Sequence, residues 1–157
     1  MEIKLVKFGF RFRFYLNANL RRVKTVTGVN SQIDDNTHFL MWDFDDVPLS
    51  TVEESLKSVQ DMFYLPAISI IKTKEYGYHA YCFKACSFVE ARGIIGLTAN
   101  VDRHFLAAGC SRGYFTLRFS EFEGRGFEHC ITLFSDIKSD LDYSDINCFV
   151  EYTKAVK

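Results

Sequence analysis

The chain has little proline, no long apolar run and no signal-peptide core, and each shortage excludes a class of protein. Only 2 of its 157 residues are proline, and no proline-rich or serine-rich tract interrupts it. We therefore expect a single domain over residues 1–157. No apolar stretch is long enough to cross a bilayer. We expect a soluble cytoplasmic protein with no membrane partner, or one in the host-cell cytoplasm if the gene is viral or plasmid-borne.

Paired cysteine motifs are also missing. The five cysteines are an odd number and form no Cys-x-x-Cys motif, which excludes a disulfide framework and fits a reducing compartment. His79, Cys82 and Cys86 are close enough in sequence to raise the question of zinc. However, His79 and Cys82 are three apart in a predicted strand and would point to opposite faces, which argues against such a site.

A net charge of −1 conceals an uneven distribution of charge. Residues 1–24 contain seven basic residues and one acidic residue, whereas residues 121–145 contain seven acidic and two basic residues. A basic segment on a neutral protein can bind a polyanion, although two solvated faces that balance each other would look the same. With Tyr15 as a stacking candidate, the candidates for nucleic-acid binding are Arg11, Arg13, Arg21, Arg22 and Lys24.

Apolar and aromatic residues are abundant, at 48% of the chain with 16 Phe and 8 Tyr, so we expect a packed core. Ser-x-x-Glu patterns at Ser50 and Ser87 predict two helices that begin with a capping box. Residues 100–112 are mixed, and 145–156 fit either a helix or a strand. Periodicity predicts strands at 7–14, 23–26, 38–44, 67–72, 78–84, 114–119 and 131–134, with the first helix ending near Phe63.

The order of these elements over residues 38–120 is β-α-β-β-α-β, which predicts an α+β fold with a ferredoxin-like or RRM-like core. An N-terminal β unit and a C-terminal extension are added to it. In this topology the first and third strands are neighbours in the middle of the sheet, and the helices cover one face. The other face is left for function, although the fold alone does not say which function.

A group of charged residues is predicted on that open face. Asp43 and Asp45 are two apart on one strand and share a face, where they would repel each other unless solvated in a turn or neutralised by a cation such as Mg²⁺. His79 falls on the neighbouring strand and could bind a phosphate. Gly77 would let a phosphate approach the backbone, and Lys74 would add positive charge.

Two more residues are expected near the same face. Asp102 follows the second helix and would complete a cluster of three carboxylates. Such a cluster could hold two metal ions for nucleotidyl transfer. Arg118 lies between Leu117 and Phe119 in the last core strand, where a half-buried arginine needs an anionic partner. That partner could be a triphosphate or one of the three aspartates; an internal salt bridge is the simpler alternative.

The segments FLMWDFD, YGYH and NVDRHFL…TLRFS resemble the three motifs of the archaeo-eukaryotic primases, which include the primase-polymerases of plasmids and viruses. The resemblance covers about residues 38–120. It implies a DNA primase or DNA polymerase that makes or extends short RNA or DNA strands from nucleoside triphosphates on a single-stranded DNA template. Asp43, Asp45 and Asp102 would hold Mg²⁺ or Mn²⁺, and His79 and Arg118 would bind the triphosphate. A helicase or other replication protein is a candidate partner.

Departures from the family pattern leave other functions open. Gly77 stands where the family has serine, and the lysine that often follows the arginine motif is absent, with Arg125 as a substitute. A degenerate primase relative, or an RRM-like module that binds single-stranded nucleic acid without catalysis, is therefore the alternative. A replication-initiator endonuclease is disfavoured because the four histidines form no His-x-His pair.

Overall fold

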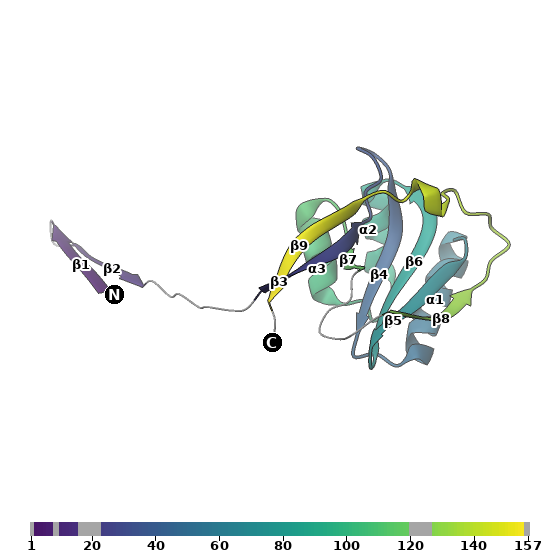
Figure 1. Ribbon diagram of the computed structural model, residues 1–157, viewed down its shortest axis with the longest axis horizontal. Helices are drawn as coiled ribbons and strands as arrows, with labels where there is room; N and C mark the ends of the chain where they lie inside the picture. The colour runs from purple at the N-terminus through teal and green to yellow at the C-terminus, as the bar shows by residue number, and fades with distance from the viewer. Residues whose placement is uncertain (1, 8–9, 16–22, 120–126, 156–157) are drawn as a thin grey trace.

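The computed structural model describes residues 2–7, 10–15, 23–119 and 127–155, and within them it confirms the α+β class. Its strands form a hairpin of β1 and β2, a four-stranded sheet in the order β4-β6-β5-β8, and a three-stranded sheet in the order β7-β3-β9 (Figure 1). The elements are β1 (Glu2–Lys7), β2 (Phe10–Tyr15), β3 (Val23–Asn30), β4 (His38–Asp45), α1 (Leu49–Phe63), β5 (Ile68–Lys74), β6 (Gly77–Cys86), α2 (Phe88–Leu97), α3 (Arg103–Arg112), β7 (Thr116–Arg118), β8 (Glu128–Leu133) and β9 (Phe149–Ala155).

The four-stranded sheet is antiparallel throughout, with β4 and β5 on either side of β6. Alternation along β4 sends Leu40, Trp42 and Phe44 toward the helices, and all three are fully buried. Asp43 and Asp45 therefore point to the opposite face, on which none of the described helices packs (Figure 1). The pairing of β4 with β6 and of β5 with β6 agrees with the predicted order of the core.

Helices α1 and α2 cover the apolar face of this sheet through Val52, Leu56, Ala91 and Ile95, none of which is exposed. The predicted capping box of α2 is confirmed: Ser87 accepts from the backbone of Glu90, whose carboxylate accepts from the backbone N–H of Ser87.

The predicted capping box of α1 is wrong. Pro48 occupies the N-cap position, with no side-chain cap, and Ser50 lies inside the helix. The backbone carbonyl of Pro48 already accepts from Thr51 and Val52, so the helix begins before Ser50 can cap it.

Helix α3 was not predicted from the sequence. It begins at Asp102, whose carboxylate accepts a 2.7 Å hydrogen bond from the backbone N–H of Phe105, and it ends at Gly113, which has a φ of 84°. Both residues are ordinary helix boundary signals. The metal-binding role that was predicted for Asp102 competes with this capping role.

The placement of the last core strand differs from the expected sheet. A ferredoxin-like core would put β7 beside β4, whereas β7 pairs antiparallel with β3, and Arg118 lies opposite Gly28. The tail, left open between helix and strand, forms β9 on the other edge of β3. Strand β8 lies at the other edge of the four-stranded sheet, beside β5. It covers most of the predicted strand at 131–134 and begins earlier, at Glu128.

The two sheets diverge from the short turn that joins β3 to β4. Ser31 lies at this turn and is fully buried. Its hydroxyl accepts from the backbone N–H of Phe115 at 3.0 Å and lies 3.1 Å from Nδ1 of His38, while its carbonyl accepts from the backbone N–H of Phe39. Beyond this junction β3 and β4 belong to different sheets. The candidate site lies between these two sheets.

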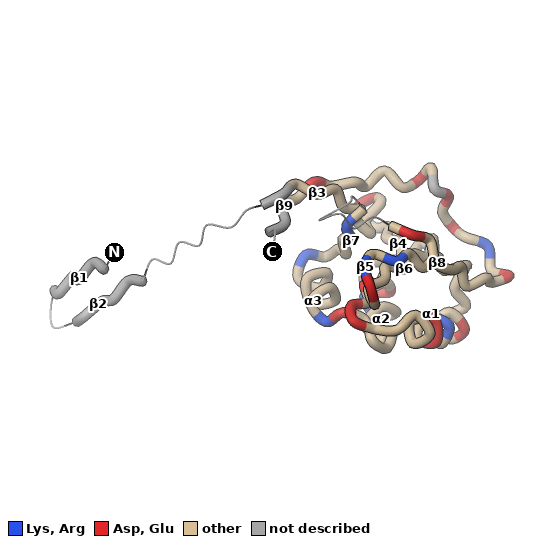
Figure 2. Tube along the Cα trace, turned by 60° about the horizontal axis from the view of Figure 1, so that its bottom comes forward, with Lys and Arg blue, Asp and Glu red and all other residues tan. Residues whose placement is uncertain are grey.

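The basic N-terminal segment is described only in part. Where one strand was expected at 7–14, the chain forms β1 and β2, with Arg11 opposite Val6 and Arg13 opposite Lys4. Arg21 and Arg22 lie outside the described residues, and Lys24 lies on β3 opposite Lys154. Acidic residues gather on the connection from β8 to β9, which carries Asp136, Asp140, Asp142 and Asp145 (Figure 2). Among the helices that the structure describes, none is long and apolar enough to cross a membrane.

Candidate functional site

A polar pocket of about 170 Å³ opens between the helix-free face of the four-stranded sheet and the three-stranded sheet. It collects five of the predicted residues: two carboxylates, a lysine, a histidine and an arginine. Its lining consists of Asp43, Asp45, Thr73, Lys74, His79, Thr116, Leu117, Arg118 and Tyr152. The open face of the predicted core is thus where charged side chains gather.

Asp43 and His79 face each other across the β4–β6 ladder. Oδ1 of Asp43 lies 3.7 Å from Nε2 of His79, which is longer than a direct hydrogen bond, and the histidine side chain is only 7% exposed. On its other side, Nδ1 of His79 lies 3.4 Å from the hydroxyl of Tyr81. When that hydroxyl donates to Nδ1, the ring carries its hydrogen on Nε2, toward Asp43.

Tyr81 remains a hydrogen-bond donor because burial raises the pKa of its hydroxyl, with a further rise from the nearby charge of Asp43. Arg118 opposes this rise. Burial likewise raises the pKa of Tyr152, and the same two charged groups act on it in opposite directions. Both tyrosines therefore stay neutral at physiological pH, and the charges of Asp43 and Arg118 act on the pKa of each.

Lys74 binds the second carboxylate. Its Nζ lies 3.0 Å from Oδ1 of Asp45 and 3.6 Å from Oδ1 of Asp46. The hydrogen bond to Asp45 raises the pKa of Lys74 above its ordinary value, so the ammonium group is charged. Gly77 was predicted to let a phosphate approach the backbone. In the structure, a Cβ at this position would overlap the methylene groups of Lys74. The space above Gly77 is thus filled by the lysine stem, and Gly77 permits the Lys74–Asp45 contact.

Arg118 approaches the pocket from β7, in the other sheet. Its guanidinium carbon lies 4.9 Å from the centre of the Phe127 ring, in cation–π geometry. The same ring lies 6.0 Å from the ring of His79. Phe127 therefore contacts both phosphate-binding candidates and links the two sides of the pocket.

Asp102 is close to the pocket but does not line it. Its backbone N–H donates a 2.8 Å hydrogen bond to the carbonyl of Asp43, which places it at the free edge of β4. Its carboxylate Oδ1 is engaged in capping α3. Within the described part of the chain, no three His, Cys, Asp or Glu residues gather in a way that could hold a metal ion. The expected cluster of three carboxylates is therefore reduced to the pair on β4.

The pair fits a hard divalent cation in its chemistry. The side chains of Asp43 and Asp45 are 25% and 45% exposed and supply oxygen ligands on one face, and the pocket leaves room for water and for substrate oxygens. Lys74, His79 and Arg118 can bind the oxygens of a phosphate. The residues of the zinc alternative, in contrast, are divided: His79 lines this pocket, whereas the thiol of Cys82 points to the carbonyl of Pro66.

Tyr152 and Phe127 were not identified from the sequence. Tyr152 comes from the tail, where a strand was one of two options, and its ring packs over Gly28. A Cβ built at Gly28 would lie 2.8 Å from that ring and 2.9 Å from the carbonyl oxygen of Leu117, so this position needs glycine. The alternation of the FVEYT segment was the available signal for Tyr152. For Phe127 no local pattern existed.

Comparison of the chain with protein-family models, with curated proteins and with solved structures gave no match.

Proposed function

We propose that the chain is a metal-dependent nucleotidyltransferase that works as a DNA primase or primase-polymerase. The observation that carries this proposal is the convergence of Asp43, Asp45, His79 and Arg118 in one pocket, although they come from three strands of two sheets. The same residues occupy the motif positions that resemble the archaeo-eukaryotic primases, on a ferredoxin-like order of elements. Template-directed synthesis on single-stranded DNA is the activity that this resemblance implies.

The residues of the pocket have separate roles in this proposal. Asp43 and Asp45 would hold Mg²⁺ or Mn²⁺, which on binding neutralises charge at the phosphate that is attacked. Asp102, at the edge of β4, would contribute through Oδ2, because the α3 cap uses only Oδ1. Arg118 and Lys74 would bind phosphate oxygens from opposite sides of the pocket. His79 would donate Nε2–H to a phosphate, with Tyr81 holding the tautomer.

Incorporation of labelled nucleotides on a single-stranded DNA template tests the proposal. Wild-type protein should give product with Mg²⁺ or Mn²⁺ and none with chelator. Asp43→Asn should lower the rate at least about 100-fold, because a metal ligand contributes several kcal/mol to the transition state. Asp136→Asn is a matched control, since Asp136 is an exposed carboxylate on the β8–β9 connection. Product that is unaffected by Asp43→Asn or by chelator would refute the assignment.

A second function is favoured by one observation, the use of the Asp102 carboxylate as a helix cap. A chain with only two carboxylates in the pocket could bind single-stranded nucleic acid without catalysis. The same variants discriminate between the two functions. For a non-catalytic module, wild type and Asp43→Asn would bind a labelled oligonucleotide equally well, with or without chelator, and neither would form product.

A further inference from the structure

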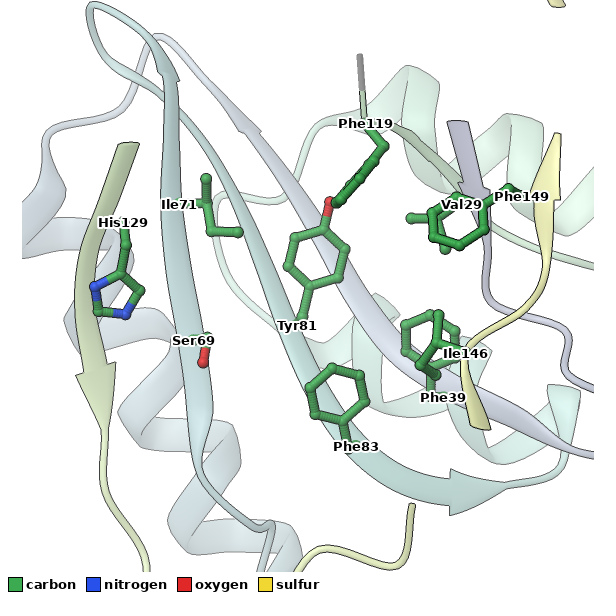
Figure 3. A pocket seen from close by; sticks show the side chains of 10 residues that line it. All are labelled: Val29, Phe39, Ser69, Ile71, Tyr81, Phe83, Phe119, His129, Ile146 and Phe149. Carbon is green, nitrogen blue, oxygen red and sulfur yellow. The ribbon is translucent and has the colours of Figure 1, made fainter. Parts of the chain in front are cut away.

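A second, apolar cavity of about 260 Å³ adjoins the polar pocket on the helix-free face of the sheet (Figure 3). Its walls are largely aromatic, with Phe39, Tyr81 and Phe83 from the four-stranded sheet and Phe119 and Phe149 from the side of the three-stranded sheet. Drug-sized ligands occupy cavities of about 300–1,000 Å³, so this one suits a smaller flat group.

The cavity has a buried floor and an exposed rim. Phe39 and Tyr81 are 1% and 9% exposed, whereas Phe119 and Phe149 are 54% and 50% exposed, with ring centres 5.4 Å apart. Contiguous patches of exposed large apolar side chains mark binding surfaces, whereas single exposed ones do not. The mouth of the cavity is therefore the place where a ring would enter and stack.

The apolar cavity and the polar pocket are adjacent to each other. The hydroxyl of Tyr81, in the apolar cavity, lies 3.4 Å from Nδ1 of His79, in the polar pocket. On β7, Arg118 lines the polar pocket and its neighbour Phe119 lines the apolar cavity. A molecule with an anionic end and a flat apolar end would therefore fill both spaces at once.

Few polar groups line the apolar cavity, and these lie at its far side. Ser69 on β5 and His129 on β8 present a hydroxyl and a ring nitrogen, well apart from the phenylalanines near β9 (Figure 3). Aromatic walls with isolated hydrogen-bonding groups are typical of sites for planar heterocycles, because stacking holds the ring and the polar groups contact its edge.

We infer that this cavity is a nucleobase subsite, which takes the base of the nucleotide whose phosphates lie against Arg118, Lys74 and His79. The inference rests on the proposed function for the phosphate end and extends it to the base. The protein itself then holds the base, so a nucleotide binds before a template is present.

Calorimetric titration of the full chain without nucleic acid tests this inference. The ligands are the magnesium complexes of ATP, GTP, CTP and UTP, magnesium tripolyphosphate, and adenosine. Phe149→Ala removes a stacking ring from the rim, and Ser69→Phe fills the cavity from β5. Phe134→Ala is the matched control, because Phe134 is 83% exposed and lines neither space. Circular dichroism establishes that each variant is folded.

The expected result has three parts. At least one nucleotide binds about tenfold or more tightly than tripolyphosphate. Phe149→Ala and Ser69→Phe weaken nucleotide and adenosine binding about 5- to 100-fold, as expected for one base–aromatic stack, and leave tripolyphosphate unchanged. Phe134→Ala changes nothing.

Other results overturn the inference in distinguishable ways. If nucleotides bind no better than tripolyphosphate, or if neither cavity variant changes nucleotide affinity, no base enters the cavity. The phosphate site would be unaffected by that result. If Phe149→Ala weakens only a single-stranded oligonucleotide and leaves free nucleotides unaffected, the cavity takes a base of a strand, and our assignment to the nucleotide is wrong. If adenosine binds with the expected sensitivity but no nucleotide is incorporated on a template, the subsite stands and the proposed polymerase activity fails.

Discussion

Replacing Lys74 by methionine should change metal binding and nucleotide binding in opposite directions. Methionine keeps an unbranched apolar stem over Gly77 but removes the ammonium group that lies 3.0 Å from Asp45. A cation that binds Asp45 must first displace that group, so its removal favours the metal. A triphosphate loses a positive partner, so its affinity falls.

The size of the metal effect follows from the exposure of the ion pair. The side chains of Lys74 and Asp45 are 30% and 45% exposed, and pairs that are open to water contribute about 0.2–1 kcal/mol. Displacing Lys74 costs the metal that amount, which is a factor of about 1.5–5 in affinity. Loss of a charged hydrogen bond to phosphate costs about 1.5–3 kcal/mol, so nucleotide binding should weaken about tenfold or more.

The assay is a Mn²⁺ titration followed by electron paramagnetic resonance, with nucleotide affinity measured separately by calorimetry. Lys84→Met is a close control, because Lys84 pairs with Asp140 at the same 3.0 Å and with similar exposures of 38% and 40%, away from the pocket. Equal Mn²⁺ affinity for wild type and Lys74→Met, or an equal change in Lys84→Met, would show that Lys74 and the metal do not share Asp45.

Two further predictions concern the packing that supports the site. Trp42→Phe should lower the free energy of unfolding by about 1–3 kcal/mol, because the fully buried indole donates a 2.9 Å hydrogen bond to Thr98 and the smaller ring leaves a void; a loss below about 0.5 kcal/mol in urea denaturation would contradict this. Burial lowers the pKa of His38 in the folded state, so the unfolded state takes up a proton first as the pH falls. The contribution of His38 to the free energy of unfolding is therefore fully present above the unfolded pKa of about 6.5 and decreases as the pH falls below it. The free energy of unfolding should therefore differ less between pH 7.5 and pH 5.5 for His38→Gln than for wild type. The same decrease in both proteins would exclude His38 as the cause.

The part of the site on β4 and β6 could be predicted from the sequence because it depends on local rules. Strand parity places Asp43 and Asp45 on one face, and the β-α-β-β-α-β order predicts that the third core strand lies beside the first, where His79 lies opposite Asp43. The buried run from Phe39 to Phe44 and the capping box at Ser87 are equally local signals. The shared face, the buried run and the capping box follow from neighbours a few residues apart, whereas the pairing of β4 with β6 follows from the order of the elements.

The parts that could not be predicted depend on partners distant in sequence. Strand β7 has only three residues, too few to prefer one partner, and its pairing with β3 requires Gly28, where a side chain would meet both Tyr152 and the β7 backbone. Asp102 was open to two roles, a metal ligand and a helix cap. The helix that follows it has a weak apolar pattern, so the capping role could not be recognised.

The arrangement of the two sheets explains why charged residues from separate sheets lie in one pocket. Asp43 and His79 are fixed by the β4–β6 ladder, and Arg118 is fixed by its pairing with Gly28 in the other sheet. The junction between the sheets is the turn at Ser31, whose buried hydroxyl holds His38 of β4 and the backbone just before β7. The separation of the carboxylates from the arginine is therefore set at this turn. The space between them is a pocket, which the proposed binding of a triphosphate and its cation requires.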